Sequence, residues 1–333
     1  MENWSEFVAE LSYSHLEIRI AARQDTYFEA WPGAIIRNNF FYAIENVVVK
    51  KGVPLSEIIN AYSLTEKHPF YKNMMGGFPK GVVLQLGSGM QRYENRIKIR
   101  QGEILSFSLL LVGNQKNWYK SYIEAVRLMC DRGMGHPMQS FDLLDIYERH
   151  PSRGVHLIAR EQCKKIEKLS LPVYFNDFSF SETQRDIGIS LETPTLLHYI
   201  GTTKQCKTGY QAKLNGFPSF YQFVRSAAFR CLKLTALYVH PEDTGRSQQA
   251  TAYIEEYLNN AGEPWLKQAN MKLVTVRGTL KDTGEKPIIF NGYTGEMFYH
   301  GRVAPYLQLL GFMQELGVGN DTIYGLGQYR IIN

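Results

Sequence analysis

Cysteine is scarce in this sequence, and no two cysteines are spaced as a pair. Only 4 occur among the 333 residues, and none forms the C-x-x-C arrangement of zinc sites and redox motifs. We therefore expect no metal site of this kind and, in a reducing compartment, no disulfide bonds. The sequence predicts core thiols for all of them, namely Cys130, Cys163, Cys206 and Cys231.

Long apolar runs are also missing. No stretch approaches the roughly 18 consecutive apolar residues of a membrane-spanning helix. The first residues, Met1 to Glu6, have neither the basic start nor the apolar segment of a secretory signal. We expect a cytoplasmic protein without a membrane span. A composition of 44% hydrophobic and 21% charged residues is typical of globular proteins, and 333 residues favour two domains.

Aromatic residues, in contrast, are abundant, with 21 Tyr and 18 Phe beside a mildly basic net charge of +5. In the segment 91–100, Tyr93 stands among the cations Arg92, Arg96, Lys98 and Arg100. Such interleaving suits RNA, because rings stack on bases while cations meet phosphates. An ordinary exposed charged strand would have the same pattern.

The apolar residues of the first half alternate between the periods of strands and helices. Leu16, Ile18 and Ile20 alternate with polar residues, as in a half-buried strand. The segment after Pro32 has helical spacing, with proline in the first turn, where its missing N–H is tolerated. The expected order is strand, helix, strand, strand, helix, Gly-x-Gly, strand. The segments are 14–22, 32–44, either 82–85 or 93–100, 102–113, 118–129 and 141–147.

The second half repeats this order. It predicts a strand, a long helix, a less regular helix, two strands, a third helix, a glycine-rich loop and a final strand. These are residues 187–198, 217–237, 248–266, 272–280, 295–301, 306–316, 317–327 and 328–332.

Both halves therefore end in a helix, a Gly-x-Gly joint and a strand, with Gly133-Met-Gly135 corresponding to Gly317-Val-Gly319. This predicts an α+β protein made of tandem ferredoxin-like (RRM-like, βαββαβ) domains. We place the N-terminal domain at residues 1–168 and the C-terminal domain, with the glycine-rich loop, at 169–333.

The loop from Gly317 to Gly327 has glycines at 317, 319, 325 and 327. Glycine permits positive φ and close backbone approach, so the loop either makes tight turns or presents N–H groups to a phosphate. Its spacing matches neither the dinucleotide motif G-x-G-x-x-G nor a P-loop. We therefore expect no cofactor.

A duplicated unit with the loop Gly-Val-Gly-Asn-Asp-Thr-Ile-Tyr-Gly-Leu-Gly before its last strand resembles the RAMP superfamily of CRISPR-associated proteins. Within it, the chain is similar to the endoribonucleases that process CRISPR precursor RNA. Residues 32–40, Pro-Gly-Ala-Ile-Ile-Arg-Asn-Asn-Phe, look like the family's first helix, although the usual Leu-Arg-Gly run is absent. Residues 193–197, Thr-Pro-Thr-Leu-Leu, look like the opening of its second half. The resemblance covers nearly the whole chain.

This resemblance implies cleavage of repeat RNA without a metal. A ribose 2′-OH attacks the adjacent phosphate and leaves a 2′,3′-cyclic phosphate and a 5′-OH. The reaction needs a base, an acid and cations or N–H donors for the charged phosphorane. Histidine suits the proton transfers, and Lys, Arg and Tyr suit the charge.

The sequence has 8 histidines, so the catalytic assignment is a ranking. His68 stands first because it follows the first helix in a polar stretch beside Lys72, and the family often places its catalytic histidine in or just after this helix. A merely solvated side chain is the competing interpretation. His15, at the start of the first strand, and His150 come next, followed by His300. Tyr42 on the first helix is an assisting candidate, with packing against the sheet as its alternative. The other histidines, 136, 156, 198 and 240, are expected to be structural.

For RNA binding we expect the glycine-rich loop to offer backbone N–H groups and nearby cations to offer charge. An ordinary solvated helix face is the alternative for the helical cations. The candidates are Gly317, Gly319, Asn320, Gly325, Gly327, Arg225, Arg230, Lys233 and Arg330.

The expected partner is CRISPR repeat RNA, and a CRISPR effector complex and a homodimer are left open. The main alternative function is a non-catalytic RAMP subunit that binds RNA within such a complex. A metabolic enzyme on a ferredoxin-like scaffold is a third class, for which no cofactor motif is present.

Overall fold

The computed structural model describes residues 4–49, 52–60, 79–91, 93, 96–160, 165–170, 172–197, 217–259, 264–278 and 288–332. The N-terminal half contains helices α1 (Trp4–Val8), α2 (Pro32–Glu45), α3 (Leu55–Asn60) and α5 (Tyr119–Arg132). Its strands are β1 (Ser12–Ala22), β2 (Thr26–Phe28), β3 (Val82–Leu86), β4 (Ile97–Ile99), β5 (Ile104–Val112), β6 (Phe141–His150), β7 (Gly154–Arg160) and β8 (Val173–Tyr174).

The C-terminal half contains helices α6 (Phe220–Tyr238), α7 (Thr244–Leu258) and α8 (Leu307–Leu316). Its strands are β9 (Asp186–Thr195), β10 (Trp265–Arg277), β11 (Ile289–His300) and β12 (Tyr329–Ile332). No helix of these described segments is long and apolar enough to cross a membrane.

The two main sheets have the same strand order. The N-terminal sheet runs β3-β5-β1-β6-β7, with β8 beside β1, and the C-terminal sheet runs β10-β11-β9-β12. Counted within each main sheet, both contain the order second, third, first, fourth strand, and all of these pairs are antiparallel. This is the ferredoxin-like arrangement, so the predicted tandem α+β fold is confirmed.

Three local predictions need correction. The segments 82–85 and 93–100 are not alternatives, because β3 joins the main sheet and β4 pairs with β2. The helix expected over 248–266 ends at Leu258, and Trp265 already begins β10. Strand β7, which extends the N-terminal sheet, is not among the expected strands. Strands β7 and β10 have mostly exposed residues and lie at sheet edges, so their periodic signal is weak.

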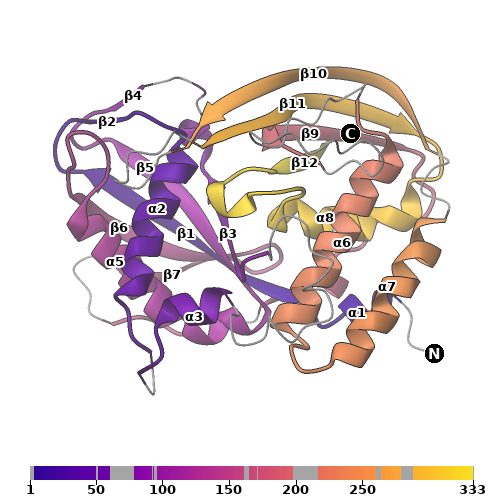
Figure 1. The fold of residues 1–333 in the computed structure, drawn as a ribbon, viewed down its shortest axis with the longest axis horizontal. Coiled ribbons are helices and arrows are strands. Elements are labelled where there is room, and N and C mark those ends of the chain that lie inside the picture. The colour runs from indigo at the N-terminus through magenta and orange to yellow at the C-terminus, as the bar shows by residue number, and fades with distance from the viewer. Residues whose placement is uncertain are drawn as a thin grey trace.

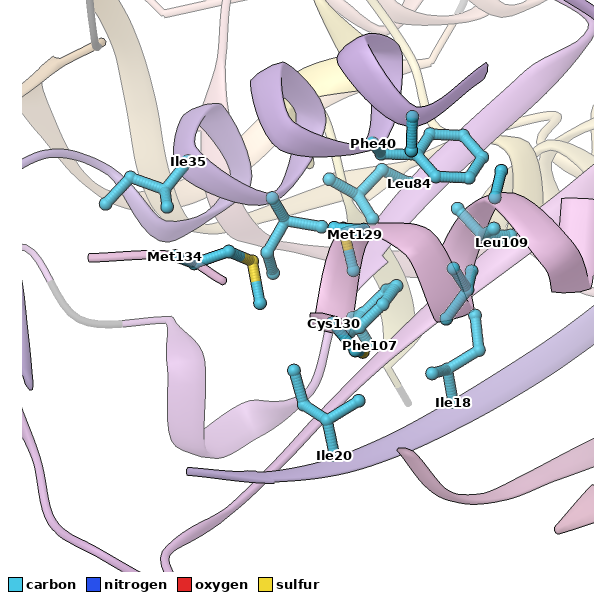
Figure 2. Packing of buried hydrophobic residues seen from close by; sticks show 14 of the residues in the cluster. Ile18, Ile20, Ile35, Phe40, Leu84, Phe107, Leu109, Met129, Cys130 and Met134 are labelled. Atoms are coloured by element: carbon cyan, nitrogen blue, oxygen red, sulfur yellow. The ribbon is translucent and has the colours of Figure 1, made fainter. Parts of the chain in front are cut away.

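One face of the N-terminal sheet forms a core with α2 and α5. Ile18 and Ile20 of β1 point toward these helices, and Phe40 of α2 and Met129 of α5 pack on the same side (Figure 2). Cys130 lies in this core and Cys231 in the core of the other half, both as free thiols. Cys163 and Cys206 lie outside the described residues.

The halves share their cores. Val276, Phe290 and Leu326 of the C-terminal half belong to the N-terminal cluster, and Tyr13 and Leu110 belong to the C-terminal one. Strands β10 and β11 arch over both halves toward the start of α2 (Figure 1). There the backbone N–H of Trp31 donates a hydrogen bond to the Arg277 carbonyl at 2.7 Å. The two units are thus packed as one body of shared apolar contacts.

The first turn of α2 meets the glycine-rich loop at Gly33. A Cβ on Gly33 would lie 1.9 Å from the carbonyl oxygen of Tyr324. The same oxygen accepts a hydrogen bond from the Trp31 indole N–H at 2.7 Å. Glycine is required here because the loop backbone occupies the space of a side chain.

We predict that Gly33→Ala lowers the melting temperature, although alanine is the better helix former by about 1 kcal/mol. The clash with Tyr324 outweighs that gain, since overpacking typically costs about 1–3 kcal/mol. Thermal denaturation followed by circular dichroism measures the change. Gly89→Ala is the control, because nothing lies within 4 Å of the place that its Cβ would take. A melting temperature for Gly33→Ala at or above the wild-type value would contradict the account.

Candidate functional site

The glycine-rich loop follows α8 and lies against β9 of its own half and α2 of the other. Its backbone donors are largely engaged within the protein. Gly327 N–H donates to Pro194 O at 3.2 Å, Asn320 N–H to Leu196 O at 3.3 Å, and Gly325 N–H to Thr322 O at 3.1 Å. The expectation that these three N–H groups face a phosphate is therefore not met in this conformation.

The loop's glycines instead allow close packing. Gly327 has a φ of 74°, and a Cβ there would lie 2.1 Å from the Val318 carbonyl oxygen. Gly317, Gly325 and Gly327 are buried, whereas Gly319 and Asn320 are half-buried. Only the latter two remain near enough to the surface for contact with a ligand.

Arg37 on α2 is held between two aromatic rings, one from each half of the chain. Its guanidinium carbon lies 4.1 Å from the centre of the Phe41 ring, one helical turn on, and 4.9 Å from that of Tyr324 in the loop. Nη1 donates to the Asn38 Oδ1 atom at 2.9 Å, whereas Nε is buried without a hydrogen-bond partner. Among the described residues, no carboxylate lies within 4 Å of this guanidinium. A buried, uncompensated N–H on a cation is costly and is a donor ready for an anion.

Lys80, two residues before the start of β3, is the second cation of this region. Burial lowers the pKa of its ammonium group, and the positive charge of Arg37 lowers it further. Helix α2, which carries Arg37, also packs against β3, so the two cations lie in the same part of the fold. We call Arg37 and Lys80 the cation pair. The sequence alone does not single out Arg37 as a functional residue. Its contact with Tyr324 joins two residues that are far apart in the sequence, so no local pattern predicts it.

The backbone on either side of the span 61–78 lies beside Lys80. The Tyr238 hydroxyl of α6 is 3.2 Å from the Ile59 carbonyl oxygen and 2.9 Å from that of Pro79. The span that carries His68 and Lys72 therefore leaves and re-enters the described fold at one place, next to the cation pair. His68 and Lys72 themselves lie outside the described residues, so their candidate roles remain predictions.

Tyr42 does not pack against the sheet. It is 48% exposed, and the Arg132 guanidinium of α5 lies 3.6 Å from its ring centre. Arg132 also donates to the Asn39 Oδ1 atom at 3.2 Å. Tyr42 thus faces α5, on a different side of α2 from Arg37 and Phe41.

His15 lies between the halves. Its Nε2 atom is 2.9 Å from Ser108 Oγ of β5, and its Nδ1 atom is 3.8 Å from Glu315 Oε2 of α8. Burial, followed by the charge of Arg149, lowers the pKa of His15 to about 4. Burial raises the pKa of Glu315. A neutral, enclosed imidazole with so low a pKa is a weak base at neutral pH.

The other histidine candidates lie at strand ends. His150, at the end of β6, is buried, and its Nδ1 atom is 3.2 Å from Ser152 Oγ in the turn before β7. His300 ends β11, where its Nδ1 atom is 2.9 Å from Asp186 Oδ1. His15 lies opposite Arg149 in the β1–β6 ladder, so His15 and His150 belong to opposite faces of that sheet, and His300 lies in the other sheet.

The cations expected to bind RNA are also dispersed. Arg225 of α6 lies 3.8 Å from Glu255 of α7. Arg330 of β12 is exposed and lies 2.6 Å from Glu192 Oε1, on the sheet face opposite the buried neighbour Tyr329. Burial lowers the pKa of Lys233, with a further effect of Arg230.

Arg230 is not on a solvated helix face. It is buried, its Nε donates to the Leu316 carbonyl at 3.3 Å, and burial lowers its pKa to about 10. A cation at the carbonyl end of α8 satisfies an orphan acceptor there and opposes the helix dipole. Arg230 therefore stabilises the end of α8, and it is not available at the surface for the expected contact with RNA. Among the described residues, no three potential metal-ligating side chains cluster.

Comparisons with known proteins connect this geometry to a family. Residues 189–329 match the family model of the CRISPR-associated endoribonuclease Cas6, and residues 11–171 match a model described as an N-terminal domain. The C-terminal part of the chain thus carries a Cas6 endoribonuclease domain. The predicted resemblance is thereby confirmed, and with it a general role in binding and processing CRISPR RNA. No protein of curated function matches the sequence significantly.

Two solved structures have a fold similar to that of this chain. The Cas6 of a product complex, from Thermus thermophilus, is 14% identical with a TM-score of 0.52, over 96% of this chain and 99% of that one. A partial Cas6-RT-Cas1–Cas2 complex contains a chain that is 11% identical with a TM-score of 0.56. That match covers 97% of this chain and 46% of the other.

We predict that His15→Gln flattens the acid side of the stability profile. The folded-state pKa of about 4 lies below the usual 6.5, so the imidazole is neutral in both states above pH 6.5. As the pH falls from about 6.5 to 4, only the unfolded chain takes up the proton. Stability then falls by up to about 3 kcal/mol. Urea unfolding at several pH values measures this.

Glutamine can keep the bond to Ser108 without titrating, and the raised pKa of Glu315 affects both proteins alike. His156→Gln, at an exposed position on β7, is the control. Identical pH profiles for His15→Gln and wild type would contradict the assigned protonation.

Proposed function

We propose that this protein is a metal-independent endoribonuclease that binds CRISPR repeat RNA and cleaves it to a 2′,3′-cyclic phosphate and a 5′-OH. The observation that carries the proposal is the cation pair, with the uncompensated Arg37, at the place where the span bearing His68 and Lys72 joins the fold. The match of residues 189–329 to the Cas6 endoribonuclease model supports the substrate, and the tandem fold provides a surface between two halves.

In this reaction the 2′-oxygen attacks the adjacent phosphorus while the bond from phosphorus to the 5′-oxygen breaks. A base removes the 2′-OH proton and an acid protonates the leaving oxygen. We assign the proton transfer to His68. Arg37, Lys80 and Lys72 stabilise the extra negative charge of the phosphorane, because preorganised cations act strongly where water is excluded. His15, His150 and Tyr42 remain alternative catalytic candidates, although each contacts a different residue within the protein.

For the RNA itself, we propose that Gly319 and Asn320 contact the backbone from the half-buried part of the loop. Lys233, Arg225 and Arg330 add longer-range attraction, which falls with salt. We keep a CRISPR effector complex and a homodimer as proposed partners, and the cytoplasm as the proposed compartment. The boundary between residues 168 and 169 stays our proposed division into domains.

One observation favours a second function, that of a non-catalytic RNA-binding subunit. Helix α2 contains no histidine, and no histidine of the described residues is shown in contact with Arg37. Such a protein would hold repeat RNA on the same cations and leave it intact.

The deciding experiment incubates the protein with its cognate repeat RNA in excess EDTA. One defined cut ending in a cyclic phosphate supports the enzyme. Tight binding of RNA that stays intact supports the subunit, and failure to bind removes both proposals.

We predict that His68→Ala reduces single-turnover cleavage by a factor of about 100 or more, because a general acid or base contributes about that much. Binding of uncleaved RNA should change little. Denaturing gel electrophoresis and filter binding measure the two effects. His156→Ala, on the exposed part of β7, is the matched control. Full activity of His68→Ala would move the role to His15, His150 or His300.

We also predict that Arg37→Gln weakens RNA binding. A plot of the logarithm of the association constant against the logarithm of the salt concentration should become less steep by about 0.7 in slope, the value for one lost contact with a single-strand phosphate. Arg132→Gln is the matched control, since Arg132 also stacks on an aromatic ring of α2 but faces α5. Binding titrations between low and high salt measure the slope. An equal slope for both variants would remove Arg37 from the RNA site.

A further inference from the structure

Tyr93 presents an aromatic ring at the surface in a fixed orientation. It is 37% exposed and lies parallel to the buried Trp31, with 5.7 Å between ring centres and 8° between planes. Its hydroxyl donates to the Glu192 carbonyl at 2.9 Å. The ring is thus held by an indole from the N-terminal half and a backbone acceptor from the C-terminal half.

A cation accompanies this ring. Nζ of Lys272, in β10, lies 5.9 Å from the Tyr93 ring centre. Lys272 pairs with Thr294 of β11, near the middle of the long hairpin. An exposed ring with a nearby ammonium group is the combination that single-stranded nucleic acids use, because the ring stacks on a base and the cation meets a phosphate.

The stacked pair is linked to the cation pair through Tyr324. The carbonyl of Tyr324 accepts from the Trp31 indole, and its ring packs on the Arg37 guanidinium. One loop residue therefore contacts both places. RNA lying along this loop can reach Arg37 and Tyr93 together.

We propose that Tyr93, supported by Trp31, is a stacking surface for a base in an unpaired segment of the bound RNA, with Lys272 on the adjoining phosphate. The inference rests on the proposed function and adds a second contact to its site. The segment is unpaired because both faces of a base inside a duplex are already covered by its neighbours. Stacking tolerates any base, so this contact favours single strands over duplexes without fixing the sequence.

Substitution at Tyr93 tests this role directly. Tyr93→Leu should weaken binding of a repeat RNA with an unpaired segment by about 10-fold, which is typical for loss of one stacked base. Tyr93→Phe keeps the ring and loses the bond to Glu192, so it should bind nearly as wild type. Tyr174→Leu is the matched control, because Tyr174 is 39% exposed with Lys116 Nζ 5.8 Å from its ring centre.

The readout is a scan with 2-aminopurine, a fluorescent base that is quenched by stacking, placed at each unpaired position in turn. Wild type, Tyr93→Phe and Tyr174→Leu should quench the same position, and Tyr93→Leu should not. Melting temperatures confirm that each variant is folded.

Three results would overturn the inference while leaving the proposed function in place. They are unchanged affinity of Tyr93→Leu, equal losses for the Leu and Phe variants, and equal losses for unpaired and fully duplex RNA. Absence of RNA binding by the wild-type protein would instead overturn the proposed function, and this inference with it.

Discussion

The contact between Tyr324 and the start of α2 is the constraint on which the site depends. The Tyr324 carbonyl lies where a side chain on residue 33 would be, and it accepts the Trp31 indole N–H. This contact presses the glycine-rich loop of one half onto the first helix of the other. Because Tyr324 also packs on Arg37, the same contact orients the guanidinium. The backbone turns sharply directly after Tyr324, where the adjoining Gly325 has a φ of 70°.

The charges around this contact are arranged for an anion. The guanidinium of Arg37 gains from the quadrupoles of the two rings, but among the described residues its Nε atom has no acceptor. Lys80 adds a second positive charge, and burial, followed by the charge of Arg37, lowers the pKa of its ammonium group. Perturbed groups of this kind cluster at functional sites, although structural networks perturb pKa values too. Arg230 is an example of the structural kind, since its Nε donates to the Leu316 carbonyl at the end of α8, although its Nη2 is buried without a partner.

The sequence was sufficient to predict the architecture. The apolar residues of β1 alternate and those of α2 have helical spacing, and in the structure these same residues face the core. It also identified the loop at 317–327 and, by resemblance, the family. It could not identify Arg37, whose partner Tyr324 is distant in sequence, or the burial of Arg230 and His15. Both of these polar side chains lie where elements of different sequence regions meet. The glycine pattern predicts exposed N–H groups, yet the N–H groups of Gly327 and Asn320 donate to the carbonyls of Pro194 and Leu196, and that of Gly325 donates within the loop.

The central claim is that the scissile phosphate lies at the junction of the halves, beside Arg37 and Lys80. A crystal structure with repeat RNA carrying a single 2′-deoxynucleotide at the cleavage position tests it directly, since the missing hydroxyl prevents attack. The account predicts that the phosphate following the deoxynucleotide contacts the Arg37 guanidinium, with the span 61–78 adjacent. A scissile phosphate bound on the polar face of the N-terminal sheet, around Glu17 and Arg149, would contradict it.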